Sequence, residues 1–366
     1  LFEQRNAQDL LKLAFDLEFD FIYVLADMES NGIKIDVNLL KKLKEINSVY
    51  IQELTNKIYE TSGAEFNINS PKQLGIVLFE TLGLSAGKKT KTGYSTDEAV
   101  LSSLFDAHDV IPLLLNYREA YKLQSTYIEP LLELGLKNED NRIHTSFLHT
   151  GTATGRLSSK NPNLQNIPVK SEAGSQIRSA FIPENGYTLV GIDYSQIELR
   201  LLAHFSGDEA LVNAFNNDLD IHYQTAVKIF GEDEAKDKRS IAKSINFGLL
   251  YGMGSKKLGD TLGISSKDAK IYIESYFKAF KSVKDYLKSV EDFAHVNGYI
   301  KTLLNRKRLF NFDSANAMIK AAYLREAVNT MFQGSAADLI KLSMVEIHKK
   351  YKNNNNVRML LQIHDE

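Results

Sequence analysis

Acidic residues at the ends of two short apolar runs are the first candidates for chemistry. Asp193 follows the run 188–192, and Asp365 and Glu366 follow the run 359–363. Each run is typical of a buried strand, and an acid at a strand end is held rigidly at the edge of a sheet. Two such ends side by side could hold two divalent metals about 4 Å apart, as used for in-line phosphoryl displacement. Carboxylate oxygens suit Mg²⁺. The same residues would also fit two solvated strand ends, because adjacency cannot be read from one sequence.

A row of basic and aromatic residues lies in a predicted helix over 235–250. Arg239, Lys243, Phe247 and Tyr251 recur at four-residue intervals, so they share one slowly drifting helix face. A helix N-terminus favours anions, and two cations on the same face would add a clamp for a polyphosphate. Phe247 would offer a flat surface to a sugar or a base. The alternative is a solvated charged face beside an aromatic core stripe.

Two polar loops could donate hydrogen bonds to nucleic acid. The segments 152–159 (TATGRLSS) and 161–168 (NPNLQNIP) are rich in short hydroxyl, amide and basic side chains. Such groups bind phosphates and the edges of sugars and bases. Lysines and arginines cluster at 88–91 and at 301–308. As a set, these segments predict cationic loops around the two acid-bearing runs, although each alone could be an ordinary solvated loop.

The hydrophobic periodicity predicts a mainly helical chain that positions these residues with a few strands. Ser70 and Pro71 are typical of an N-cap followed by the first helical position. The spacing of apolar residues predicts helices over 36–60, from 71, and over 113–134, 196–205, 220–230, 235–250, 265–295 and 322–349. The predicted strands cover 188–192 and 357–363, and 85–96 is predicted to be a polar loop.

The composition excludes several classes of protein. The chain has 366 residues, of which 43% are hydrophobic and 25% charged, as in ordinary globular proteins, and roughly two domains are expected. The absence of cysteine excludes a disulfide scaffold, a Cys-based zinc site and a cysteine nucleophile. No run approaches about 18 apolar residues, so no membrane span is expected. The net charge of −2 argues weakly against a nucleic-acid partner.

Several segments resemble family A DNA polymerases. Three look like that family's motifs A, B and C: DYSQIELR at 193–200, RSIAKSINFGLLYG at 239–252 and QIHDE at 362–366. The two polar loops look like its template–primer loops, and REAVNTMFQGSAADLIK at 325–341 looks like the helix before motif C. FNINSPKQLGIVLFETLGL at 66–84 resembles its thumb. The resemblance therefore covers nearly the whole chain, and bacterial members of the family are the most similar.

The resemblance implies an α+β, mostly helical fold shaped like a right hand, with an antiparallel palm sheet, a helical thumb and helical fingers. The expected palm sheet contains 187–193 and 357–366. The expected domains are a connecting segment after an upstream exonuclease-type domain (1–30), the thumb with the start of the palm (31–135), the first part of the palm with motif A (136–206), the fingers with motif B (207–320) and a truncated second part of the palm with motif C (321–366).

The resemblance also implies template-directed DNA synthesis from dNTPs, with two Mg²⁺ ions and release of pyrophosphate. Asp193 and Asp365 would hold the ions together with Tyr194, and Glu366 would be a supporting carboxylate. In the dNTP site, Arg239 and Lys243 would bind the triphosphate, and Lys243 would be a candidate proton donor to pyrophosphate. Phe247 would pack on the deoxyribose, and Tyr251 would lie near the templating base. Glu198 would exclude the ribonucleotide 2′-hydroxyl, and Gln196 and His222 would line the pocket.

The same resemblance implies a set of residues that contact primer–template DNA. Minor-groove acceptors are similar in all base pairs, so donors there would check pair geometry without reading sequence. The expected DNA-binding residues are Arg156, Thr152, Asn163, Gln165, Asn166, Arg325, Asn329, Gln333, His364, Lys88 and Lys89. We expect a monomer in the bacterial cytoplasm, associated with the nucleoid, with no membrane partner and a role in replication and repair.

Two other functions stay open, together with two departures from the family pattern. A non-catalytic DNA-binding module is opposed by the intact Asp193 and Asp365, and an RNA polymerase of the same superfamily is opposed by Glu198. Because the strand that would complete the motif C hairpin lies beyond Glu366, we expect the chain as it stands to be poorly folded around the palm and nearly inactive. The DxE pattern at 16–18 is interpreted as a coincidence in a connecting helix.

Overall fold

The computed structural model describes residues 7–86, 89–90, 93–169 and 171–366. The chain divides into two compact units, and each is formed from segments that are distant in the sequence. The first unit contains Leu1–Asn31, Ser146–Lys160 and Val190–Glu366, and the second contains Gly32–Thr145 and Asn161–Leu189. The mostly helical composition agrees with the fold class expected from the sequence.

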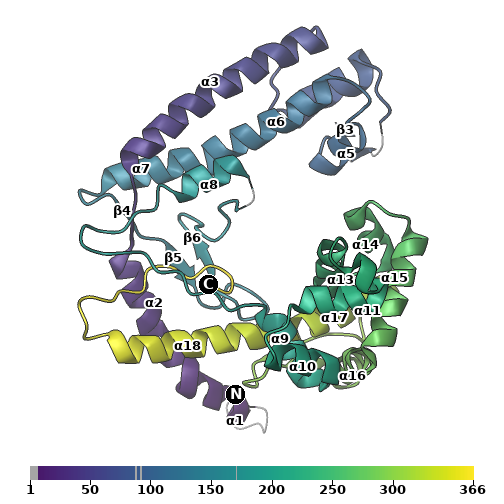
Figure 1. Cartoon of the computed structure of the whole chain (residues 1–366). Helices are drawn as coiled ribbons and strands as arrows, with labels where there is room; N and C mark the ends of the chain where they lie inside the picture. Colours follow the sequence, from purple (N-terminus) through teal and green to yellow (C-terminus); the bar gives the residue numbers. More distant parts are fainter. Residues whose placement is uncertain (1–6, 87–88, 91–92, 170) are drawn as a thin grey trace. The chain divides into compact units, whose positions relative to one another are not determined.

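The first unit is a set of helices around one large apolar core, with two short antiparallel hairpins (Figure 1). Phe21, Tyr276, Phe280 and Phe332 are among its fully buried side chains. Its elements are α1 (Ala7–Leu13), η1 (Ala14–Glu18), α2 (Phe19–Asn31), β5 (Ser146–Leu148), β6 (Ser158–Lys160), α9 (Ile197–Ser206), α10 (Glu209–Asn216), α11 (Ile221–Phe230), α12 (Glu232–Ala235), α13 (Arg239–Leu250), α14 (Ser255–Leu262), α15 (Ser266–Ala279), α16 (Lys281–Asn297), β7 (Tyr299–Lys301), β8 (Lys307–Leu309), α17 (Ala317–Asn329), η4 (Thr330–Gly334) and α18 (Ser335–Tyr351).

The second unit is organised by a long helical pair, α3 and α6, which lie side by side (Figure 1). Leu54, Ile58, Leu74 and Leu114 are buried in its apolar core. Its elements are β1 (Ile33–Lys34), α3 (Val37–Ser62), α4 (Pro71–Ile76), η2 (Val77–Thr81), β2 (Lys89–Thr90), β3 (Gly93–Tyr94), α5 (Glu98–Ser103), α6 (Val110–Lys122), η3 (Leu123–Ile128), α7 (Glu129–Lys137), β4 (Arg142–Ile143) and α8 (Glu172–Arg178).

Most of the helices predicted from periodicity are confirmed, together with their end signals. Helix α3 begins after Asp36, whose carboxylate accepts hydrogen bonds from two backbone N–H groups of the first turn. Helix α4 begins with Pro71 after the Ser70 cap. The helix predicted over 265–295 is two helices, because the chain turns at Phe280, whose buried ring packs in the core.

The strands predicted over 188–192 and 357–363 are wrong, and the palm sheet expected to contain them is not formed in the described part of the chain. Neither segment belongs to a strand ladder. Val190 and Ile192 are exposed, at 77% and 69%. An apolar run indicates an extended chain and a preference for burial. A strand also needs a neighbouring strand in register, which the sequence pattern does not specify.

The segment 1–30 is expected to be a connecting segment. Its described residues pack into the first unit. Leu13, Leu17, Phe21 and Met28 belong to the main core. Two of its acidic residues, Asp20 and Asp27, pair with the basic end of α18. None of the described helices combines the length and apolar composition that crossing a membrane requires.

Candidate active site

The two acid-bearing segments lie against each other in the first unit. The backbone N–H of Tyr194 donates to the carbonyl oxygen of Asp365, at 3.1 Å. Gly191 packs so closely that a Cβ there would collide with the carboxylate of Glu366. Asp193 and Asp365 are therefore brought into one neighbourhood, as the sequence interpretation required, although the segments that carry them are not strands.

Tight backbone geometry fixes both segments. Ile363 and Glu366 exchange two backbone hydrogen bonds, at 2.8 and 2.9 Å, which close a turn around Asp365. His364 in that turn has φ +57°, and Gln196, at the start of α9, has φ +56°. Non-glycine residues rarely adopt this left-handed conformation, and such strain is concentrated at functional sites. We call residues 362–366 the carboxylate turn.

The donor chemistry of this neighbourhood fits a hard divalent cation. Asp193 and Glu366 are exposed and Asp365 is half-buried, so none of the three residues is enclosed by the protein. Within the described ranges, no three His, Asp or Glu side chains converge as a ready-made metal cage. In proteins generally, Mg²⁺ binds through one or two carboxylates and takes its remaining ligands from water and substrate phosphates. The hydroxyl of Tyr194 contacts Ser343 Oγ at 2.5 Å.

Glu198 is the centre of a half-buried polar group. One of its carboxylate oxygens accepts from Arg156 Nη2 at 2.5 Å, and the other accepts from the hydroxyl of Tyr251. The side chain of Gln333 also hydrogen-bonds Tyr251. Burial raises the pKa of Glu198, the negative charge of Asp365 adds to the rise, and Tyr251 and Arg156 oppose it. Four of the expected site residues, Glu198, Arg156, Tyr251 and Gln333, therefore meet here. The charge of Asp365, in the carboxylate turn, acts on the pKa of Glu198.

The basic helix α13 meets α11 in a second polar group. Arg239 Nε donates to Asp220, at 2.5 Å, and Asp220 in turn caps the first turn of α11. His222 is buried, its Nδ1 lies 3.0 Å from Asn246 Nδ2, and its ring is 5.7 Å from that of Phe247. Burial lowers the pKa of His222 to about 4, and the positive charges of Arg239 and Lys243 add to the fall. This histidine is therefore neutral near pH 7, and the cations beside it carry the positive charge.

The α17–η4 segment carries three further candidates. Arg325 is exposed and packs against Gly252, which follows Tyr251. Gln333 joins the Glu198 group through Tyr251. The buried side-chain oxygen of Asn329 accepts no hydrogen bond within the described structure, so it is an acceptor in position for a ligand or a water.

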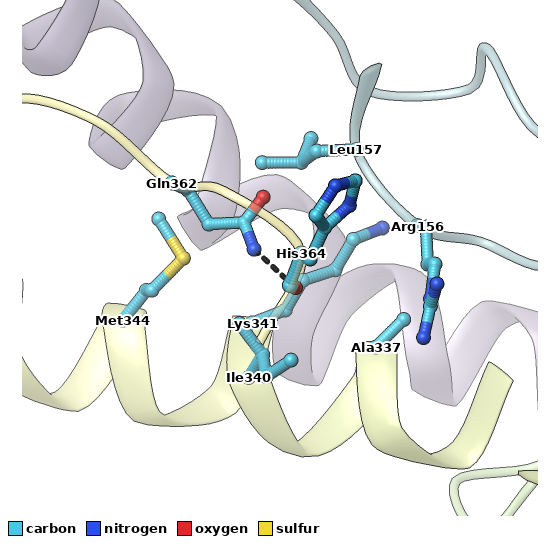
Figure 2. A pocket seen from close by; sticks show the side chains of 8 residues that line it. All are labelled: Arg156, Leu157, Ala337, Ile340, Lys341, Met344, Gln362 and His364. Atoms are coloured by element: carbon cyan, nitrogen blue, oxygen red, sulfur yellow. Dashed lines mark hydrogen bonds between the residues drawn. The ribbon is translucent and has the colours of Figure 1, made fainter. Parts of the chain in front are cut away.

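A small cavity lies beside the carboxylate turn (Figure 2). Its volume is about 20 Å³, and its lining includes Arg156, Lys341, Gln362 and His364. Gln362 Nε2 donates to the carbonyl oxygen of His364, at 2.6 Å. Two expected DNA-binding residues, Arg156 and His364, thus share one cavity.

The remaining expected DNA-binding residues are divided between the units. Thr152 is in the first unit and donates to the carbonyl oxygen of Arg156, at 2.8 Å. Asn163, Gln165 and Asn166 are in the second unit, where Gln165 is buried and Asn166 is exposed. Lys88 lies outside the described residues, and the description of Lys89 is limited to its backbone in β2.

The loop 301–308 differs from its expected role as a cationic surface. Arg306 is largely buried and pairs with Glu18 and Asp338. Arg308 pairs with Glu326, and Lys307 lies over the ring of Tyr299, at 3.8 Å. These three cations have acids or an aromatic ring of the first unit as partners, from Tyr299 in the neighbouring strand to Glu18, 288 residues from Arg306.

One cluster of charged residues in the structure is not predicted from the sequence. Glu18 contacts His149, Arg306 and Lys341, and Arg306 continues to the fully buried Asp338. The pattern DxE contains Glu18, but nothing local in the sequence indicates partners about 130 to 320 residues away. We call these five residues the buried charge network.

A family model described as DNA polymerase family A matches residues 37–366. The chain belongs to DNA polymerase family A. The DNA polymerase I of Helicobacter pylori (strain J99) is 53% identical over 360 residues, which cover 98% of this chain and 40% of the relative. The DNA polymerase I of Bacillus subtilis (strain 168) is 45% identical, with 100% of this chain and 42% of the relative covered. The chain thus spans about two fifths of the length of these curated relatives.

A solved structure of the same family has a closely similar fold. It is the POL domain of Pol1 from M. smegmatis, in a complex with DNA primer-template and dNTP. The TM-score is 0.89 at 41% sequence identity, and the match covers 97% of this chain and 64% of the other. The resemblance inferred from the motifs is confirmed at the level of the family and of the overall fold.

Proposed function

We propose that the protein carrying this chain is a template-directed DNA polymerase, which adds dNTPs to a primer 3′-hydroxyl and releases pyrophosphate. The observation that carries the proposal is the hydrogen bond from Tyr194 to Asp365, because it joins the ends of motifs A and C. Family membership supports the same reaction class. A role in bacterial DNA replication and repair, as a cytoplasmic monomer associated with the nucleoid, belongs to the same proposal.

Asp193 and Asp365 would hold two Mg²⁺ ions, with Tyr194 beside them. Bound there, the ions would supply activation of the primer hydroxyl and stabilisation of the leaving pyrophosphate. Glu366 reaches the backbone of Gly191 and adds negative charge to this neighbourhood. The reciprocal hydrogen bonds of the carboxylate turn hold Asp365 in place before substrate arrives, which is the preorganisation that such chemistry needs.

The incoming dNTP would bind along α13. Arg239 and Lys243 would hold the triphosphate, and Asp220 orients the Arg239 guanidinium through its Nε. Because its pKa is about 4, His222 would line the pocket as a neutral group, behind Phe247. Lys243 is exposed at this face, where it would donate a proton to the departing pyrophosphate.

Glu198 would select the sugar, with Gln196 beside it at the start of α9. Its carboxylate is fixed by Arg156 and Tyr251, so a ribonucleotide 2′-hydroxyl would meet a rigid wall instead of a mobile side chain. Phe247 would pack on the deoxyribose, and Tyr251 would lie near the templating base.

Primer–template DNA would be contacted from both units. Arg156, Arg325 and His364 supply cationic or polar side chains in the first unit, with Thr152, Asn329 and Gln333. Asn163, Gln165 and Asn166 would contribute from the second unit, and the proposal also includes Lys88 and Lys89. The thumb (31–135), the fingers (207–320) and the palm with motifs A and C (136–206 and 321–366) are the domains proposed on this basis.

The test is primer extension by the natural protein that contains this chain, with the four dNTPs and Mg²⁺. Asp193→Asn should lower the single-turnover rate by about 1,000-fold or more, equivalent to about 4 kcal/mol of transition-state stabilisation. The exposed Asp285, in α16, offers a matched control, and Asp285→Asn should extend primers at the wild-type rate. Extension by Asp193→Asn at the rate of the control would refute the proposal.

A further inference from the structure

Lys341, a member of the buried charge network, lies beside the carboxylate turn. Lys341 is 2% exposed, and its ammonium lies 3.2 Å from both carboxylate oxygens of Glu18. Its stem passes over the ring of Phe21, with the ammonium 5.4 Å from the ring centre. The same side chain lines the small cavity together with Gln362 and His364, the first and third residues of the turn (Figure 2).

The network is balanced and tightly held. Arg306 donates from Nε to Asp338 at 2.8 Å and reaches Glu18 with Nη2. Asp338 also accepts from the hydroxyl of Thr302. Two carboxylates therefore face the basic side chains of Arg306 and Lys341, with His149 as a further contact of Glu18. Burial alone would raise the pKa of Glu18, but the hydrogen bond with His149 and the charges of Lys341 and Arg306 lower it to about 2.

We propose that Glu18 and Lys341 are positioning residues, which set the height and orientation of the carboxylate turn through the cavity that Lys341 and Gln362 share. This inference rests on the proposed polymerase function and names two residues outside its motifs. An ammonium group has three donors, and the ammonium of Lys341 donates to both carboxylate oxygens of Glu18. The cavity is large enough for one water, which would link Lys341 to the polar groups of the turn.

The proposal explains why an N-terminal helix is fixed to α18 by several ion pairs. Glu18 pairs with Lys341, Asp20 with Lys349 at 2.9 Å, and Asp27 with His348 at 2.6 Å. The first pair is buried beside the cavity, and the other two lie at the surface, further along α18. Asn31 Nδ2 then donates to the carbonyl oxygen of Met359, at 3.2 Å, on the approach to the turn. The segment 7–31, which precedes the family-model match, thereby supports the last residues of the chain.

The test compares Lys341→Met with Lys349→Met in the full natural protein. Both variants remove one ammonium from α18 that pairs with an acid of the N-terminal helices, but Lys349 does not line the cavity. A misplacement of reacting groups by about 1 Å can cost up to 10²-fold. We expect Lys341→Met to lower kcat about tenfold and to raise the Mg²⁺ concentration for half-maximal rate about fivefold. The KM for dNTP and the Kd for primer–template should stay within about twofold. Lys349→Met should match the wild type, and Lys341→Arg should recover at least half of the lost rate.

Amide hydrogen exchange gives a readout that does not depend on activity. In Lys341→Met, peptides that contain Tyr194 and the carboxylate turn should exchange about tenfold faster than in Lys349→Met. Should Lys341→Met fail to fold, Glu18→Asp carries the test, because it keeps the charge and withdraws the carboxylate by one bond. It should raise the Mg²⁺ requirement about threefold. Wild-type extension with unchanged Mg²⁺ dependence and exchange in the folded variants would overturn the positioning role alone, whereas loss of extension by the wild type would overturn the proposed function.

Discussion

The first unit holds two groups of carboxylates that are treated in opposite ways. Glu18 and Asp338 are buried and faced by Arg306 and Lys341. Asp193, Asp365 and Glu366 lie at the surface or half-buried, and no lysine or arginine of the described residues forms an ion pair with them. A buried charge is costly unless it is paired, so the first group is held in ion pairs and would act on the second group only by positioning it. The second group is held by backbone contacts, which leave its oxygens for a cation and its substrate.

The largest expected difference between the two groups is in activity. Asp365→Asn should lower single-nucleotide incorporation by about 1,000-fold or more, because one ligand of the proposed ions is lost. The melting temperature should not fall, since the turn around Asp365 is closed by backbone hydrogen bonds. Single-turnover incorporation and a thermal melt of the same preparation check both statements. A variant that loses activity only in proportion to its loss of folded protein would contradict the distinction.

The reverse result is expected for the buried group. Asp338→Asn leaves Arg306 without one of its two acids in a site that is fully buried, so the free energy of unfolding should fall by about 3 to 5 kcal/mol. Urea unfolding followed by circular dichroism measures this. Asp27→Asn is the control, because Asp27 pairs with His348 at an exposed position, and its loss should cost less than about 1 kcal/mol. Equal decreases in the free energy of unfolding for Asp338→Asn and Asp27→Asn would contradict the distinction between the two groups of carboxylates.

Acid should weaken the buried group gradually. The pKa of Glu18 is lowered to about 2 in the folded chain, from an ordinary value of 4.5. Its ionised form therefore stabilises the fold above about pH 4.5, and this contribution is lost as the pH falls toward 2. The stability difference between the wild type and Glu18→Gln should shrink steadily in urea unfolding at pH 5, 4 and 3. A difference that stays constant over this range would mean that the Glu18 pKa is not lowered.

A smaller effect is expected at His222, where a buried titratable group lies beside the proposed triphosphate cations. Because its pKa is lowered to about 4, its NMR signals should not titrate between pH 8 and pH 5.5. Lys243→Met should move the pKa upward, since the charge of Lys243 contributes to the lowering. A titration midpoint near 6.5 in the wild type would show that this site is more solvated than its burial implies.

The sequence predicts the local part of this architecture well. The helix over Val37–Ser62, the Ser70-Pro71 start and the face shared by Arg239, Lys243 and Phe247 all follow from periodicity and capping, which act within a few residues. The long motif strings were enough to indicate the family, which the family model confirms.

What the sequence did not predict depends on distant contacts. The apolar runs before Asp193 and after Asn356 were interpreted as strands, but a strand needs a partner in register, and no ladder forms there in the described structure. The sequence pattern predicts that the cations at 301–308 face DNA. It gives no sign of the ion pair between Arg306 and Glu18, because these residues are 288 positions apart. For the same reason, the sequence pattern does not predict the buried charge network.

The most direct test is a double-variant cycle on the exposed carboxylates. Single-nucleotide incorporation is measured for Asp193→Asn, Asp365→Asn and the variant that carries both changes. If the two residues act as one metal-binding unit, joined by the Tyr194–Asp365 contact, the double variant should be no more than about tenfold slower than either single variant. Losses that multiply fully, or near-wild-type incorporation by either single variant, would contradict a shared site at the meeting point of these two segments.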